Sequence, residues 1–329
     1  MKSKILNFKN YSNTNFSKEQ QKILMMYAPN DVISNNFFYR DYEDYAAGAF
    51  SIKEKPGKRY ENIKTTIRLN YEGEPVCFNY FHRVVLNICI SAYTEGTTSL
   101  SLDELYRRMV GNVYNPKSES PKTRKRVQPA LKAKILRALQ DLFDTRISID
   151  LTTVCLKWKK YNNGQPFTIE NRSILPGKII QGNINDKSII RIELTGESPF
   201  YTIAAMKKQI LTFPLYLLDV PTNATEDMLK IRHSLMMRLQ RRIQQGLTNT
   251  IILENFFAEL DIEFSSRNLK YTCLKYIDEV FEYWAGLKTK NFDLNSLTKI
   301  KNGNQIEGLE FEVKLSEKTA QKTQRKNSK

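Results

Sequence analysis

Five polar residues at helical spacing form the part of this sequence best suited to chemistry with a nucleic acid. They are Arg267, Asn268, Tyr271, Thr272 and Lys275. At about 100° per residue they fall on one side of a helix, opposite an apolar side that includes Cys273 and Ile277. Arg and Asn side chains can form paired hydrogen bonds with guanine and adenine edges in the major groove. The pattern predicts a helix that reads bases in duplex DNA.

The order of charges along the same helix favours this hypothesis over an ordinary solvated face, which remains the alternative. The basic residues come first, whereas Asp278, Glu279 and Glu282 lie in the second half. The helix dipole favours the opposite order, so it does not explain the pattern. A recognition helix enters the groove by its N-terminal end, which leaves acids at the far end away from phosphate.

A denser basic region precedes a second candidate helix. Between Lys117 and Arg137 the only acid is Glu119. Four residues of this region are not spaced so that they would share one side of a helix, and we expect them to contact phosphate. They are Lys122, Arg124, Lys125 and Arg126. Lys134 and Arg137 lie on the outer side of the following helix, and we expect them to read bases. A solvated basic surface is the alternative.

Two further groups of bases are expected near phosphate. Lys157, Lys159 and Lys160 precede Asn163-Gly164, a pair typical of a tight hairpin turn, so this segment is a candidate wing. Lys230, Arg238 and Arg241 form one flank of a helix predicted from 227 to 245. That flank either lies on phosphates or pairs with acids of the other module, and the sequence leaves both alternatives open.

Composition favours a polyanionic partner. The 329 residues carry a formal net charge of +16, with a sequence pI near 9.5. No apolar run approaches the roughly 20 residues of a spanning helix, and the first residues do not resemble a signal peptide. We therefore expect a cytoplasmic protein without a membrane partner. The four cysteines are far apart in apolar surroundings, which predicts buried reduced thiols.

Catalytic signatures are not found in the sequence. His82 and His233 stand alone, whereas nicking enzymes of the rolling-circle kind need two metal-binding histidines close together. A glycine-rich phosphate loop with its lysine is also lacking. The expectation is a protein that is not an enzyme and that holds no metal or cofactor.

The order of predicted elements occurs twice and predicts an α+β fold with two tandem winged-helix domains. Each copy has helices followed by strands, with a long amphipathic helix ending near Phe143 or Trp284. Four segments are expected in chain order. They are an N-terminal arm at 1–75, partly disordered with a strand near 60–71; a first domain at 76–197; a second at 198–315; and a basic disordered tail at 316–329.

The organisation resembles bacterial plasmid replication initiators of the tandem winged-helix type. The resemblance spans about Phe81 to Leu315. It rests on Ile174-Leu175-Pro176 leading to Ile190-Arg191-Ile192, on Leu217 to Asn223 leading into Lys230 to Arg242, and on Tyr283-Trp284. It implies a protein that binds repeated origin sites in double-stranded DNA and recruits host replication proteins such as a helicase or its loader. It also implies repression of its own gene as a homodimer.

Two other classes of function compete with this one. A winged-helix transcription repressor would usually carry one reading module with a dimerisation or ligand domain, and two comparable modules favour an initiator. An origin-nicking or priming enzyme is the other alternative. Direct repeats near the gene would separate an initiator from a repressor.

Overall fold

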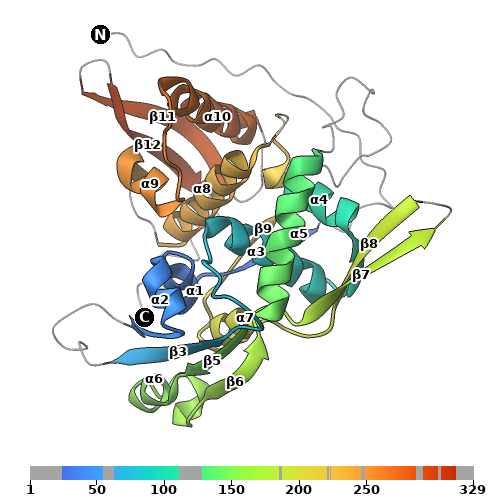
Figure 1. Cartoon of the computed structure of the whole chain (residues 1–329). Coiled ribbons are helices and arrows are strands. Elements are labelled where there is room, and N and C mark those ends of the chain that lie inside the picture. Colours follow the sequence, from blue (N-terminus) through green and yellow to red (C-terminus); the bar gives the residue numbers. More distant parts are fainter. Residues whose placement is uncertain are drawn as a thin grey trace, which may run out of the picture. The chain divides into compact units, whose positions relative to one another are not determined.

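The chain forms two compact units in a computed structural model. The described residues are 24–54, 63–110, 128–184, 187–220, 222, 224–245, 249–286, 292–302 and 305–315. Of these described residues, Leu24–Tyr216 form the N-terminal unit, and those from Leu217 onward form the C-terminal unit (Figure 1). The mixture of helices and mainly antiparallel strands confirms the α+β class.

Three helices and a three-stranded sheet form one part of the N-terminal unit. The elements are α3 (Tyr80–Thr94), β4 (Ser99–Ser101), α4 (Leu102–Val110), α5 (Pro129–Asp144), β7 (Gly177–Ile184) and β8 (Lys187–Leu194). Helix α3 is buried along most of its length and packs against both other helices. Its first turn is closed by a capping box in which Asn79 accepts from the His82 amide. The strands pair antiparallel in the order β4-β8-β7.

A four-stranded sheet forms a second part of the N-terminal unit. Its strands are β2 (Ala49–Lys53), β3 (Lys64–Asn70), β5 (Arg146–Asp150) and β6 (Thr168–Ser173), paired antiparallel in that order. Burial alternates along the strands, as expected when one face meets the core and the other meets solvent. Phe50, Ile67 and Ile149 lie on the buried face.

The remaining elements of this unit surround the two sheets. They are α1 (Val32–Phe37), α2 (Tyr42–Ala46), α6 (Thr152–Lys157), a 3-10 turn at Asn162–Gly164, α7 (Pro199–Met206) and a two-stranded sheet of β1 (Met25–Pro29) with β9 (Ile210–Pro214). Phe37 contacts both Phe78 and Phe200, with ring centroids 5.4 and 4.9 Å away. Aromatic packing therefore joins α1 to α7.

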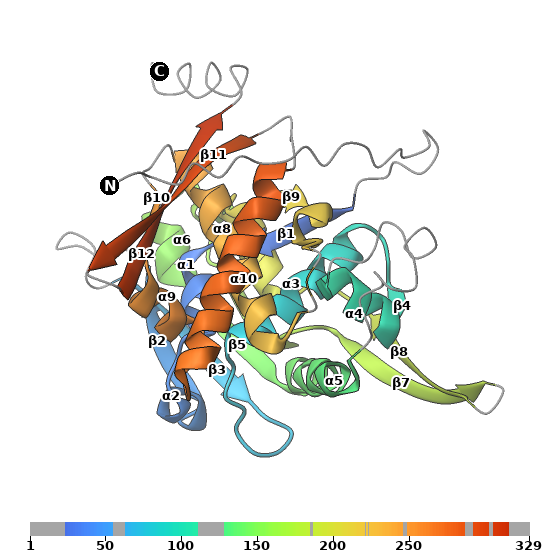
Figure 2. The same ribbon diagram turned by 90° about the horizontal axis from the view of Figure 1, so that it is seen from above.

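The C-terminal unit has one long helical pair and one three-stranded sheet. Its elements are a 3-10 turn at Leu215–Leu218, which straddles the boundary, then α8 (Glu226–Gln245), β10 (Asn249–Ile252), α9 (Leu253–Glu259), α10 (Arg267–Gly286), β11 (Phe292–Asn302) and β12 (Gln305–Leu315). Helices α8 and α10 pack together. The strand order is β10-β12-β11, with both pairings antiparallel (Figure 2).

The two units share one order of elements. Each has helix, strand, helix, helix and then a two-stranded hairpin, and in each the first strand pairs with the last. The N-terminal copy differs because β5, α6 and β6 lie between its third helix and its hairpin.

Several features differ from those expected from the sequence. The N-terminal unit begins at Leu24 instead of 76, because β1 to β3, α1 and α2 are integrated into it. It ends at Tyr216 instead of 197, because β9 must return to pair with β1. Asn163-Gly164 forms a 3-10 turn with left-handed Asn163, and the long hairpin is β7–β8. The expected tail at 316–329 lies outside the described residues.

Candidate nucleic-acid interface

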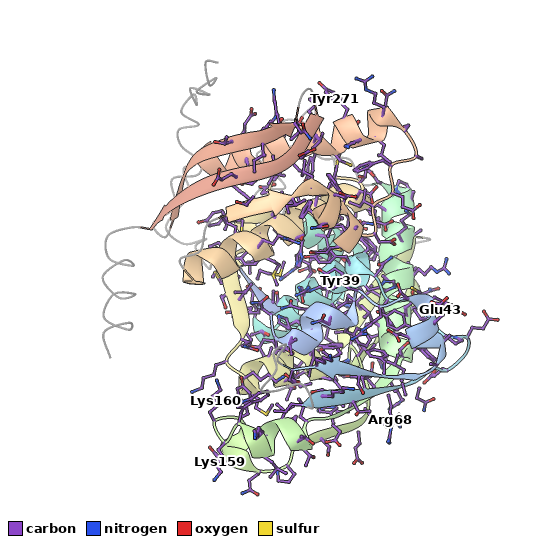
Figure 3. All side chains as sticks on the ribbon, turned by 90° about the vertical axis from the view of Figure 1, so that its left-hand side faces the viewer. Tyr39, Glu43, Arg68, Lys159, Lys160 and Tyr271 are labelled. Atoms are coloured by element: carbon purple, nitrogen blue, oxygen red, sulfur yellow. The ribbon has the colours of Figure 1, made fainter. Side chains whose placement is uncertain are left out.

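Helix α10 exposes the five residues that the sequence groups on one side. Arg267, Asn268, Tyr271, Thr272 and Lys275 are all exposed, and Tyr271 retains 69% of its accessible surface. Tyr271 is labelled on the outside of this helix in Figure 3. The ring is therefore accessible to a ligand.

The opposite side of α10 is anchored in the core of the C-terminal unit. Cys273, Ile277 and Trp284 are buried, and the indole Nε1–H of Trp284 donates to the Leu217 carbonyl at 2.8 Å. At the other end, Ser266 Oγ accepts from the Leu269 amide at 3.2 Å and caps the first turn. These contacts fix which side of the helix faces solvent.

The acids in the second half of α10 have structural partners. Asp278 Oδ2 lies 2.6 Å from Lys299 Nζ on β11. Glu279 accepts from Thr222 Oγ1 at 2.6 Å and lies 3.6 Å from Lys275 Nζ. The charge order along the helix is therefore partly explained by packing within the unit, and the basic, polar N-terminal half is the part left for a ligand.

Helix α5 presents the second expected reading face. Lys134 and Arg137 are exposed, and Ala130 and Ala133 beside them are small. Lys132 forms an ion pair with Asp103 of α4. His82 Nε2 lies 3.1 Å from Asp141 Oδ2, which links α3 to the second half of α5. These contacts hold α5 so that its basic side faces outward.

The basic run that precedes α5 was expected to contact phosphate. Lys122, Arg124, Lys125 and Arg126 lie outside the described residues. Their assignment to phosphate stays a prediction.

The three lysines expected on a first wing lie elsewhere. Lys157 ends α6, and Lys159 and Lys160 follow it before the 3-10 turn. All three are exposed, and Lys160 Nζ lies 5.0 Å from the ring centroid of Tyr161. They remain accessible cations, but the expected wing is not there, because the Asn-Gly pair does not join two paired strands.

The basic residues on the flank of α8 mainly stabilise the C-terminal unit. Lys230 is 3% exposed, lies 3.1 Å from Asp227 Oδ1 and donates to the Asp261 carbonyl at 3.0 Å. Arg238 pairs with Glu259 and lies over the ring of Phe256. The assignment of Lys230 to phosphate is thus corrected, because its charge is used inside the C-terminal unit. The partners of Lys230 and Arg238 belong to their own unit, and the side chain of Arg241 lies outside the described part of α8.

A basic surface on the four-stranded sheet was not expected from the sequence. Its exposed cations are Lys53, Lys64, Arg68 and Arg146. The alternation of apolar and polar residues along β3 could have revealed this surface. A half-buried strand between Ile63 and Leu69 puts Lys64 and Arg68 on the solvent side.

A polar cavity of about 590 Å³ lies where α5 ends. Arg146, Arg172 and Lys178 line it together with Glu72 and Asp144. Its mixed charges favour no one class of small ligand. Within the described ranges, no group of acidic, cysteine and histidine side chains is arranged to hold a metal ion. Among the described helices, none is long and apolar enough to cross a bilayer.

The cysteines follow the expectation of buried thiols only in part. Cys89, Cys155 and Cys273 are buried as expected, but Cys77 is exposed. Burial raises the pKa of the Cys89 thiol to about 12 and that of Cys273 to about 11.

No protein-family model matches the chain, and no curated protein matches it. Two crystal structures of RctB domains 2 and 3 are similar to it. The first, of selenomethionine derivatives, has a TM-score of 0.39 and 10% identity, covering 86% of this chain and 99% of the other. The second has a TM-score of 0.40 and 9% identity, covering 83% and 92%.

Proposed function

We propose that this chain is a sequence-specific double-stranded DNA-binding protein with two winged-helix modules, and that it initiates replication at repeated origin sites. The observation that carries DNA binding is the exposed polar face of α10, held outward by a buried opposite face. The repeated order of elements supports a second module of the same kind in the N-terminal unit.

Helix α10 has the properties of a base-reading helix. Asn268 and Arg267 lie in its first turn, the end by which such helices enter the major groove. Thr272 Oγ1 donates to the main-chain carbonyl of Asn268 at 2.9 Å, and the Asn268 side chain is exposed. An exposed amide can bond both adenine N6 and N7.

The hairpins after the third helices complete the proposed modules. In the C-terminal unit, β11 and β12 follow α10 directly, and in the N-terminal unit β7 and β8 follow the inserted strands. As wings, they would contact backbone beside the groove that the helix occupies. Each hairpin carries a lysine that is held by an ion pair within its own unit. Lys299 of β11 pairs with Asp278, and Lys178 of β7 pairs with Glu193.

Binding of the chain to selected DNA tests the reading role. Asn268→Ala or Arg267→Ala should weaken binding to the cognate site by roughly 1 to 3 kcal/mol and binding to random duplex much less. Glu282→Ala is the matched control, because Glu282 is exposed on the same helix in its acidic half. Equal losses on cognate and random DNA would remove α10 from base reading.

The role in initiation rests on the resemblance to plasmid initiators and needs a separate test. A replicon that carries this gene and its upstream DNA, without another origin, should be maintained in a host that supplies helicase and loader. Asn268→Ala should abolish maintenance. Repression of a reporter without any maintenance would instead support the transcription repressor.

A further inference from the structure

The solvent face of the four-stranded sheet gathers cations over small side chains. Strand register places Arg68 of β3 opposite Ala49 of β2 on one side and Ser148 of β5 on the other. Lys64 pairs with Lys53, and Arg146 is opposite Asn70. Paired residues share a face, so these long basic side chains rise from one shallow surface. We call this surface the basic sheet face.

The cations of this face, Lys53, Lys64, Arg68 and Arg146, have no ion-pair partner among the residues that the structure describes. Asp150 and Glu170 are the exposed acids on these strands. Asp150 Oδ1 already accepts from the Thr152 amide at 2.9 Å. Four exposed cations against these two acids leave the strands with an excess of positive charge.

Further exposed lysines lie on a helix that contacts the sheet. Helix α6 packs against β3, and the exposed Lys157 and Lys159 lie at its end. Figure 3 shows Arg68 and Lys159 on the same lower side of the view. Cations spaced along three strands suit an extended polyanion better than a single small anion.

The chemistry of the face favours a nucleic-acid backbone over an acidic protein. None of the large exposed apolar side chains of the described residues lies on β2, β3, β5 or β6. Protein interfaces depend on aromatic and aliphatic anchors at their centre, which this face lacks. Contacts to phosphate need only cations and small neighbours that permit close approach.

The basic sheet face begins close to the C-terminal end of α5. Strand β5 begins two residues after α5 ends, so Arg146 lies beyond the C-terminal end of that helix (Figure 1). From Lys134 to the end of α5 the helix rises about 15 Å. Phosphates bound at the sheet would therefore be other than those beside Lys134.

We propose that the basic sheet face is a second DNA-contact surface, which binds phosphates of duplex flanking the recognised site without reading its sequence. The proposal rests on the proposed function, because it extends the same duplex across the N-terminal unit. It assigns a role to Arg68 and Lys64, which the candidate recognition helices do not use.

Charge reversal on β3 tests the proposal. Arg68→Glu should lower affinity for a long random-sequence duplex at least several-fold and reduce the slope of log affinity against log salt by about 0.9 for each phosphate that is no longer bound. Lys208→Glu is the matched control, because this exposed lysine follows α7, off the sheet, and changes net charge equally. The milder Lys64→Gln/Arg68→Gln variant guards against misfolding of the reversal variant, and it should show the same direction.

Duplex length gives an independent readout. The effect of Arg68→Glu should shrink when the duplex is trimmed to the base-read site, because the flanking phosphates are then missing. A decrease in affinity that did not depend on length would place Arg68 inside the recognised site and overturn the flanking role.

The outcomes separate this proposal from the proposed function. If Asn268→Ala impairs cognate binding while Arg68→Glu behaves like Lys208→Glu, the sheet proposal fails and base reading stands. If the wild-type chain binds no duplex DNA, both fail. If Arg68→Glu leaves DNA binding unchanged but abolishes binding to polyglutamate, the face takes an acidic protein and the proposal is overturned.

Discussion

The Nζ atom of Lys207 lies 2.7 Å from Oε2 of Glu54, and both side chains are buried in the N-terminal unit. Lys207 follows α7, whereas Glu54 follows β2. Thr65 Oγ1 donates to the other carboxylate oxygen of Glu54. This buried pair joins segments that are 153 positions apart in the sequence.

Removing one partner of this pair should be costly. Lys207→Met leaves Glu54 buried without its cation, and we expect a decrease of about 3 to 5 kcal/mol in the free energy of unfolding. Urea unfolding followed by circular dichroism measures the decrease. The double variant Lys207→Met/Glu54→Leu should recover much of it, because no uncompensated charge remains. A double variant as unstable as the single one would contradict this account.

Lys230 should behave as a structural cation. Lys230→Met removes the partner of Asp227 and the donor to the Asp261 carbonyl, so we expect about 1 to 3 kcal/mol less stability. The salt dependence of DNA binding should not change, since a buried ammonium contacts no phosphate. Lys275→Gln, on the exposed side of α10, provides the comparison. A flatter salt slope in Lys230→Met would restore its role at phosphate.

Two tyrosines of α10 should separate binding from stability. Tyr271→Ala removes an exposed ring, so stability should change by no more than about 0.5 kcal/mol while cognate DNA affinity falls. Tyr276→Ala empties a buried site and should cost about 3 to 5 kcal/mol. Unfolding curves and binding isotherms of the two variants measure both effects. Unchanged DNA affinity in Tyr271→Ala would remove the ring from the interface.

The cysteines should differ in reactivity toward iodoacetamide. The thiolate is the reacting form, and burial raises the pKa of Cys89 and Cys273, so their thiolate fraction rises only at pH well above 8. At pH 8 the exposed Cys77 should be alkylated first, and the three buried thiols should react only after unfolding in urea. Mass spectrometry of the labelled peptides identifies the sites. Early labelling of Cys89 would indicate that α3 opens readily.

The basic run before α5 should act through charge alone. Replacing Lys122, Arg124, Lys125 and Arg126 by Gln should weaken binding to all duplex sequences alike. The slope of log affinity against log salt should fall by roughly 0.9 for each phosphate that the variant no longer neutralises. An unchanged slope would identify the run as an ordinary solvated surface.

Local sequence patterns predicted the C-terminal unit well. The helix predicted from 227 to 245 is α8, the long amphipathic helix expected to end near Trp284 is α10, and the strands expected after it are β11 and β12. Each of these elements follows the previous one at short range. Capping, periodicity and turn residues therefore contain most of the information needed.

Long-range pairing limited the prediction of the N-terminal unit. Strand β1 was not expected, because its pairing with β9, about 185 positions further along the chain, cannot be seen in a local window of sequence. Asn163-Gly164 suited a hairpin locally, yet the chain there follows α6 and forms a 3-10 turn. Lys230 looked like a surface cation because helical spacing cannot show that Asp227 and Asp261 enclose it.

Pairing of β1 with β9 also determines how the N-terminal unit would respond to mechanical force. Met25 lies opposite Pro214, so the chain enters and leaves the unit at the same end of one antiparallel pair. Tension applied between these two points would pull the strands apart at that end and break their hydrogen bonds one after another. Such unzipping needs less force than shearing the same bonds together. A motor that pulled on the two ends of this unit would therefore open the β1–β9 pair before it disturbed the sheets behind it.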